Sequence, residues 1–163
     1  TTAINSLMDK GMVDGRQLGI HGTSYGGYAT SLIITQTDRF AAAAVQKPVI
    51  NWMSLALTTD GAAYFVKYWF DQMPWDDYEA YWRRSPLSLV GNVTTPTMLL
   101  TGEQDHRTPI PESEQYYQAL KLRKVDSALV RIPGASHGIA SRPSQLIAKV
   151  DNILGWFARY RKD

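Results

Sequence analysis

The sequence has 163 residues, 44% of them hydrophobic and 11% aromatic, which is enough for one domain with a packed core. The formal net charge of +2 and the scattered basic residues predict no nucleic-acid partner, and no run approaches the roughly 20 apolar residues of a membrane span. The absence of cysteine excludes disulfides, thiolate metal sites and a thiol nucleophile, and it fits a reducing, cytoplasmic setting.

Strand-like and helix-like segments alternate along the chain, a pattern that predicts an α/β fold with a mostly parallel sheet flanked by helices. In chain order we expect a helix end at 2–10, a strand at 17–21, a helix from 25 to about 36, a strand at 41–45, an aromatic segment at 52–85, a strand at 97–101, a helix at 112–122, a strand at 128–132 and a helix at 144–160.

Two of these segments have a distinctive composition. The aromatic density of residues 52–85 predicts a helical excursion or lid built from large side chains. The last helix has its apolar residues on one helical face, the pattern of an amphipathic helix. Those residues are Leu146, Ile147, Val150, Ile153, Leu154 and Phe157.

The segment Gly22–Gly26 has the pattern G-x-S-x-G and lies between a predicted strand and a predicted helix. Such a turn holds Ser24 in a strained backbone conformation and presents its hydroxyl above the sheet. The backbone N–H of Tyr25, at the start of the helix, is placed to donate to an oxyanion. The sequence therefore predicts a serine nucleophile with one oxyanion donor.

Two further residues follow the ends of later strands. Asp105 comes shortly after the strand at 97–101 and is suited to orient a histidine. His137 lies in a loop after the strand at 128–132 and is suited to take the proton from Ser24 and return it to a leaving group. The chain order Ser, Asp, His is that of the α/β-hydrolase topology, and parallel strands bring such residues to one sheet edge.

Each residue also has a simpler interpretation: a glycine-rich turn, an aspartate used in turn chemistry and an exposed loop histidine. Two other histidines compete as the base. His21 lies within a predicted strand and suits packing, and His106 is adjacent in sequence to Asp105. No pair of histidines has the helical spacing of metal ligands, so we predict no metal and no cofactor.

Together these residues resemble the catalytic domain of the prolyl oligopeptidase family of serine peptidases, in its acylaminoacyl-peptidase and dipeptidyl-peptidase-like branch. The resemblance covers essentially the whole chain, and its motifs occur in family order. They are the segments 22–28, 38–42, 51–52, 85–87, 95–96, 102–105, 133–138 and 142–143, with Arg107 and Pro109.

The resemblance implies cleavage of short peptides or N-acylated amino acids through an acyl-enzyme. Arg107 resembles a family arginine that holds the substrate carbonyl, although a surface salt bridge is an equal alternative. Tyr25 is expected to form part of the substrate side-chain pocket. Trp52 and Thr108 are further candidates for its lining, with core packing the alternative for Trp52 and most other aromatic residues.

The resemblance also implies that the nucleophile strand lies in the middle of a larger sheet. Residues 1–163 are therefore expected to be the C-terminal half of an α/β-hydrolase domain, with the upstream strands and any β-propeller absent. We expect the exposed strand to cause self-association or to need a missing N-terminal segment, and the chain alone to turn over weakly. A carboxylesterase and a non-catalytic half-domain that associates through its sheet edge are alternatives.

Overall fold

Four parallel strands form the centre of the computed structural model, which describes residues 2–161. They are β1 (Gly19–Thr23), β2 (Ala42–Gln46), β3 (Thr97–Gly102) and β4 (Ser127–Ile132), and they lie side by side in that order. Every residue of β2 and β3 is buried. Burial of every residue along a strand is typical of parallel strands that are covered on both faces.

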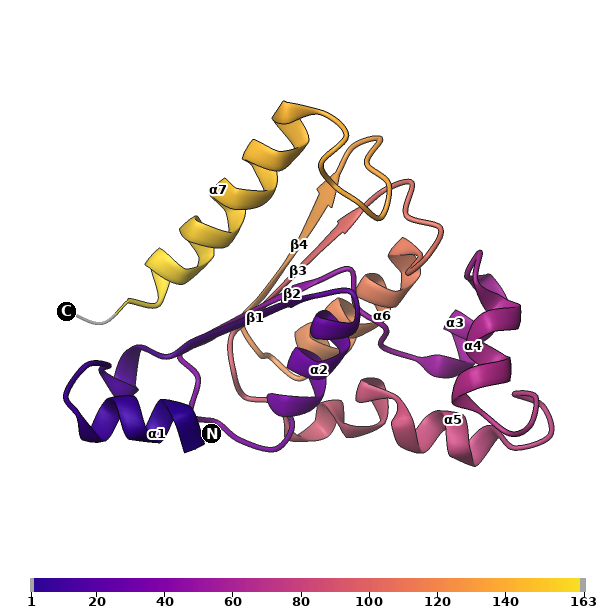
Figure 1. Ribbon diagram of the computed structural model, residues 1–163, viewed down its shortest axis with the longest axis horizontal. Helices are drawn as coiled ribbons and strands as arrows, with labels where there is room; N and C mark the ends of the chain where they lie inside the picture. Colours follow the sequence, from indigo (N-terminus) through magenta and orange to yellow (C-terminus); the bar gives the residue numbers. More distant parts are fainter. Residues whose placement is uncertain (1, 162–163) are drawn as a thin grey trace.

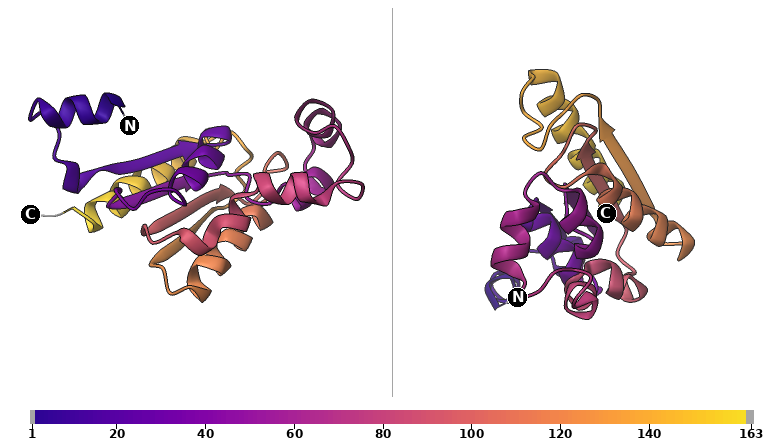
Figure 2. Two further views of the ribbon diagram at one scale, coloured as in Figure 1. Left: turned by 90° about the horizontal axis from the view of Figure 1, so that it is seen from below. Right: turned by 90° about the vertical axis from the view of Figure 1, so that its right-hand side faces the viewer.

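Helices cover both faces of this sheet (Figure 1). On one face lies α7 (Pro143–Arg159), and on the other lie α2 (Tyr25–Ile33) and α6 (Ile110–Leu122), as Figure 2 also shows. Alternate residues of β2 divide between the two cores: Ala43 and Val45 pack in the core with α6, whereas Ala42 and Ala44 pack in the core with α7. The predicted α/β architecture is confirmed.

Shorter elements complete the chain at either end of the sheet. Before β1 come α1 (Thr2–Asp9) and a short 3-10 helix, η1 (Gly15–Gln17), while a second 3-10 helix, η2 (Pro86–Asn92), precedes β3. The predicted strand at 17–21 begins two residues later because η1 occupies its first position. No helix within residues 2–161 combines the length and apolar character needed to cross a bilayer.

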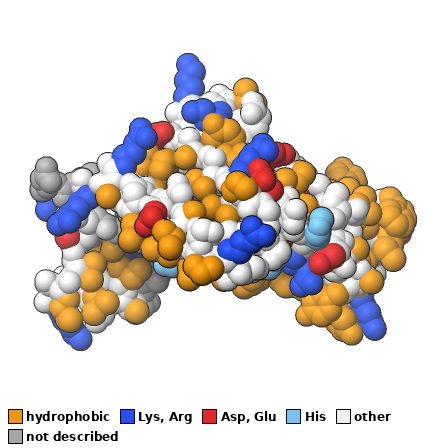
Figure 3. Space-filling view, turned by 90° about the horizontal axis from the view of Figure 1, so that it is seen from above, with side chains coloured by type: hydrophobic (Ala, Val, Ile, Leu, Met, Phe, Trp, Pro, Cys, Tyr) orange, Lys and Arg blue, Asp and Glu red, His pale blue; other side chains and the backbone are white. Residues whose placement is uncertain are grey.

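The aromatic segment is helical, as expected, and consists of three helices: α3 (Trp52–Thr58), α4 (Ala62–Trp69) and α5 (Tyr78–Arg84). They enclose a separate small core in which the rings of Phe70 and Tyr81 stack with centroids 3.6 Å apart. Other aromatic side chains stay exposed, and Figure 3 shows hydrophobic side chains gathered at this end of the molecule. The exposed ones are Tyr64, Tyr68, Trp75, Tyr78 and Trp82.

The apolar face expected for α7 is divided in the structure. Ile153 and Phe157 pack against the sheet together with Trp156, but Leu146, Ile147, Val150 and Leu154 are exposed. The residues of α7 that pack in the core beneath the helix are Ala148, Ile153, Trp156 and Phe157. Phe157 comes so near β1 that a Cβ on Gly19 would lie 2.7 Å from its ring.

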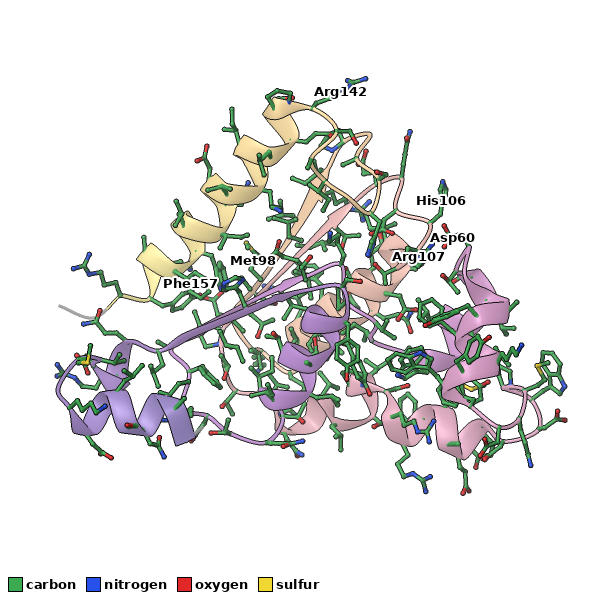
Figure 4. All side chains as sticks on the ribbon, in the orientation of Figure 1. Asp60, Met98, His106, Arg107, Arg142 and Phe157 are labelled. Carbon is green, nitrogen blue, oxygen red and sulfur yellow. The ribbon has the colours of Figure 1, made fainter. Side chains whose placement is uncertain are left out.

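β1 is an edge strand among the described residues, since it pairs with β2 and with no other strand there. An apolar groove lies on either side of it. One, of about 460 Å³, is lined by Gly19, His21 and Phe157 among others, and the second, of about 540 Å³, by Ile20, Ile33 and Phe40 among others. Figure 4 shows Phe157 reaching from α7 toward this strand.

Candidate active site

The turn between β1 and α2 holds Ser24 in the left-handed region, with φ 57°. Its N–H donates to the carbonyl of Gln46 at 2.9 Å, which ties the turn to the end of β2. The turn is tight: a Cβ on Gly22 would lie 2.0 Å from the carbonyl oxygen of Gly26. Glycine at 22 is therefore required for Ser24 to adopt this position.

Three side chains predicted from the sequence converge above the carboxyl ends of the strands. Ser24 Oγ lies 2.9 Å from His137 Nε2, and His137 Nδ1 lies 2.8 Å from Asp105 Oδ2. The Asp105 side chain is fully buried, whereas that of His137 is 29% exposed. A hydroxyl, an imidazole and a carboxylate thus form one line from the surface into the interior, an arrangement able to activate the hydroxyl.

Backbone donors hold the carboxylate of Asp105 in place. The N–H groups of Arg107 and Thr108 each donate to Oδ1 at 2.9 Å, which leaves Oδ2 for His137. Burial acts to raise the pKa of Asp105, but the hydrogen bonds from His137, Thr108 and Arg107 outweigh it, so the pKa lies below its ordinary value. Asp105 is therefore ionised when it faces the imidazole.

Tyr25 begins α2 immediately after the serine. Its N–H lies in the first turn, where backbone donors have no partner within the helix and the helix dipole favours negative charge. Its side chain is 63% exposed and its ring lies 5.6 Å from that of Trp69. Tyr25 thus offers both a donor beside the hydroxyl and an aromatic surface.

Two residues expected in a substrate pocket lie inside the protein instead. Trp52 is 1% exposed and packs among aromatic rings of α4 and the adjoining segment. Thr108 is 2% exposed, and its hydroxyl bonds to Asp105 Oδ2 at 3.2 Å and to the carbonyl of Lys47 at 3.1 Å. Trp52 therefore belongs to the aromatic core, the alternative given for it above, and Thr108 supports the carboxylate of Asp105.

Arg107 lies at the surface beside the site. Its Nε donates to Asp60 Oδ1 at 2.6 Å, and Figure 4 shows Asp60, His106 and Arg107 side by side. The backbone joins the same segments, because Asp60 N donates to the carbonyl of His106 at 2.8 Å. The salt bridge that was one interpretation of Arg107 is present, and within residues 2–161 the terminal N–H groups of the guanidinium have no hydrogen-bond acceptor.

Neither of the two competing histidines has a hydrogen bond to Ser24 or Asp105 within residues 2–161. His21 is in β1, where its ring lies 6.5 Å from that of Phe157 in an edge-on contact. His106 is exposed. Lys47, which sequence reasoning did not single out, does lie at the site: its Nζ donates to the carbonyl of His137 at 2.5 Å. The available signal was a lysine two positions after the apolar run at 41–45.

Comparison with known proteins gives a consistent result. The model of the prolyl oligopeptidase family matches residues 1–163. An uncharacterized peptidase of Bacillus subtilis, YuxL, is 39% identical over 150 residues, which cover 91% of this chain and 23% of its own length. Acylamino-acid-releasing enzyme 1 of Oryza sativa is 32% identical over 169 residues, which cover 98% of this chain and 22% of its own length.

Solved structures show the same similarity. The acylaminoacyl peptidase of Pyrococcus horikoshii aligns with a TM-score of 0.89 and 27% identity, covering 97% of this chain and 26% of its own. A puromycin-hydrolyzing peptidase of Mycobacterium tuberculosis aligns with a TM-score of 0.86 and 30% identity, covering 97% and 24%. The chain therefore spans about a quarter of the length of the relatives it matches.

Proposed function

The chain belongs to the prolyl oligopeptidase family, and from this premise we propose that it carries the catalytic residues of a serine peptidase. Ser24 is the nucleophile, His137 the general base and Asp105 the residue that orients the imidazole. The observation that carries the proposal is the continuous contact from Ser24 Oγ through His137 to Asp105, at 2.9 and 2.8 Å. Both distances allow proton transfer without rearrangement.

The mechanism follows from these contacts. His137 Nε2 takes the proton of Ser24 as Oγ attacks the scissile carbonyl, and the ionised Asp105 stabilises the imidazolium that forms. The N–H of Tyr25 donates to the oxyanion. His137 then gives its proton to the leaving amine, which frees it and leaves an acyl group on Ser24. Water, deprotonated by His137, hydrolyses this ester and restores the serine hydroxyl.

The proposed substrates are short peptides or N-acylated amino acids. Relatives named acylamino-acid-releasing enzymes and an acylaminoacyl peptidase solved with a peptidyl chloromethyl ketone support this class. In this chain, the free N–H groups of Arg107 suit a peptide carbonyl, and the exposed ring of Tyr25 beside Trp69 suits an apolar side chain. Arg107 and Tyr25 are thus the proposed substrate contacts on the surface.

We also propose that the free edge of β1 is paired by a further strand in the functional protein, so that residues 1–163 form the C-terminal part of a larger α/β-hydrolase sheet. A parallel strand with an open hydrogen-bonding edge between two apolar grooves favours pairing with another strand. In the chain alone, the strand available for this pairing is β1 of a second copy, which is the basis for expecting self-association.

A fluorophosphonate probe tests the central proposal. It reacts with a serine only when that serine is activated, so the chain should be labelled at Ser24 and the Ser24→Ala variant should not. Absence of labelling in the folded chain would contradict an assembled site. Rates for an acetylated peptide amide and a p-nitrophenyl ester, measured together, then separate peptidase from esterase activity and test the expectation that this chain alone turns over weakly.

A further inference from the structure

The residues at the carboxyl end of β2 contact all three segments of the proposed site. Gln46 accepts a hydrogen bond from the N–H of Ser24 at 2.9 Å. The carbonyl of Lys47 accepts one from Thr108, the neighbour of Asp105, at 3.1 Å. Lys47 Nζ donates to the carbonyl of His137 at 2.5 Å. The dipeptide Gln46–Lys47 therefore joins three segments: the turn at 22–26 that holds Ser24, the segment of Asp105 and Thr108, and the loop at 133–142 that holds His137, called the histidine loop below.

Lys47 is in an unusual state for a lysine. It is 7% exposed, whereas lysine side chains usually keep their charged ends in water. Its backbone is left-handed, with φ 46°, a conformation that disfavours residues with a Cβ. Burial and the nearby Lys149 lower the pKa of Lys47, while Asp105 acts to raise it. Such strain persists only where the surrounding contacts determine the conformation.

The histidine loop has few regular constraints of its own. It lies between Gly134, with φ 62°, and Ile139, a β-branched residue with φ 46°. Within residues 2–161, the only hydrogen-bond donor to the carbonyl of His137 is Lys47 Nζ. Apolar burial of Ala135 and Ile139, with hydrogen bonds from Gln104 N to the carbonyl of Ala135 and from Ile139 N to the carbonyl of Ser136, anchors the loop on either side of the histidine. Ser24 and Asp105 contact the imidazole, and Lys47 contacts the backbone of the same residue.

We propose that Lys47 is a positioning residue: its ammonium group, fixed in the interior by the left-handed turn after β2, holds the carbonyl of His137 so that Nε2 stays within reach of Ser24. This inference rests on the proposed function for its catalytic consequence. Displacement of a catalytic group by about 1 Å lowers rates on the order of a hundredfold, so a single carbonyl contact is enough to matter. Lys47 reaches the reaction only through His137.

The test compares Lys47→Met, which keeps the chain length but removes the donor, with Lys149→Met, the same change on α7 close to the site. Hydrogen exchange of the amides in 133–142 measures the order of the loop. The kinetics of fluorophosphonate labelling separate the reaction rate constant from probe binding, and thermal unfolding measures global stability.

For Lys47→Met we expect the loop amides to exchange roughly tenfold faster and the labelling rate constant to fall about 10- to 100-fold. Probe binding should stay near the wild-type value, because Lys47 acts on the position of His137 and not on the probe. The unfolding midpoint should also stay near the wild-type value. Lys149→Met should match the wild type. Unchanged loop exchange in Lys47→Met, or the same change in both variants, would overturn the proposal.

Lys47→Arg provides a second variant that keeps a cationic donor. We expect its loop protection and labelling to lie between those of the wild type and Lys47→Met, and values no better than those of Lys47→Met would count against the donor role. Hydrogen exchange also separates this inference from the proposed function. If the wild-type chain is not labelled, the proposed function of the chain fails, but loosening of the loop in Lys47→Met still decides the positioning role.

Discussion

Ser54 donates a hydrogen bond to the carboxylate of Glu112 at 2.5 Å, and this contact joins α3 to the first turn of α6 across 58 positions of the chain. The second carboxylate oxygen accepts from the N–H groups of Ile50 and Asn51, each at 2.8 Å. Glu112 is almost fully buried. It therefore fixes the path of the backbone between β2 and α3, the segment that begins with Lys47.

Glu112 gives a prediction about pH. Burial raises its pKa, despite the hydrogen bonds from Asn51, Ser54 and Ile50 that act to lower it. The folded protein then binds this proton more readily than the unfolded chain. The contribution of Glu112 to the free energy of unfolding is thus fullest below about pH 4.5 and declines as the pH rises through the raised folded pKa.

Urea unfolding at several pH values between 4 and 8 checks this for Glu112→Gln, which cannot ionise. The stability advantage of the wild type over the variant should shrink as the pH rises. Glu114→Gln, on the same helix with a half-buried side chain paired to Arg131, is the control. If the free energies of unfolding of the wild type and Glu112→Gln differed by the same amount at every pH, the prediction would be contradicted.

Asp105→Asn should disable the proposed base. The asparagine oxygen can still accept from the N–H groups of Arg107 and Thr108, so the fold should persist. Its amide would face His137 Nδ1 as a donor and stabilise the wrong tautomer, and loss of the charge removes the support for the imidazolium. We expect labelling of Ser24 to slow by about a thousand- to ten-thousandfold. A decrease of less than tenfold would argue against this role.

Gly22→Ala and Gly26→Ala form a matched pair in one turn. A Cβ at 22 would meet the carbonyl oxygen of Gly26 at 2.0 Å, whereas a Cβ at 26 has no atom within 4 Å. Gly22→Ala should lower the free energy of unfolding by about 1–3 kcal/mol and abolish labelling. Gly26→Ala, at the start of α2, should be neutral or stabilise by roughly 0.5 kcal/mol. Chemical denaturation of both variants measures the difference, and equal effects would refute it.

Asp60→Ala tests whether the ion pair orients Arg107 for a substrate. With Nε held by Asp60, the remaining N–H groups of the guanidinium point in fixed directions. Loss of the ion pair should raise the peptide concentration needed to protect Ser24 from the probe by roughly three- to tenfold, equivalent to about 1 kcal/mol of binding free energy. Asp14→Ala breaks the surface pair with Arg16, remote from the site, and should have no effect. If the peptide protected Ser24 from the probe equally well in both variants, a role for Asp60 would be excluded.

We expect the chain to self-associate through the open edge of β1. Sedimentation velocity should find species heavier than the 18.3 kDa chain, increasing with concentration. His21→Lys places a charge on the edge strand and should favour the monomer, whereas Met12→Lys, an exposed change outside the strand, should not. A single 18.3 kDa species at every wild-type concentration would contradict strand pairing.

The parts of the fold that could be predicted are those governed by local pattern. The apolar strands and the amphipathic helix around Tyr116 lie within a few residues of their expected positions, because buried parallel strands and helices leave strong periodic signals. The sites of Ser24, Asp105 and His137 followed from motif and chain order. Their distances had to come from the structure, because they depend on how separate strands pack.

Other features depend on contacts that no local pattern records. The burial of Lys47 and Glu112 is set by partners 90 and 58 to 62 positions away in the chain. The division of the apolar residues of α7 depends on which of them meet the sheet, which periodicity does not measure. Long-range hydrogen bonding and packing between elements are tertiary properties, and they decide which predicted surfaces become interior.

The line from Ser24 to His137 joins residues separated by 113 positions, and it exists only when β1 and β4, the outer strands of the described sheet, are both in place. Three successive parallel pairings, β1 with β2, β2 with β3 and β3 with β4, lie between the two residues, and non-local parallel pairings of this kind form slowly during folding. Reactivity of this one hydroxyl therefore reports the last step of assembly. In a refolding experiment, the time at which the serine becomes reactive would date the closing of the whole sheet, while helix signals would appear earlier.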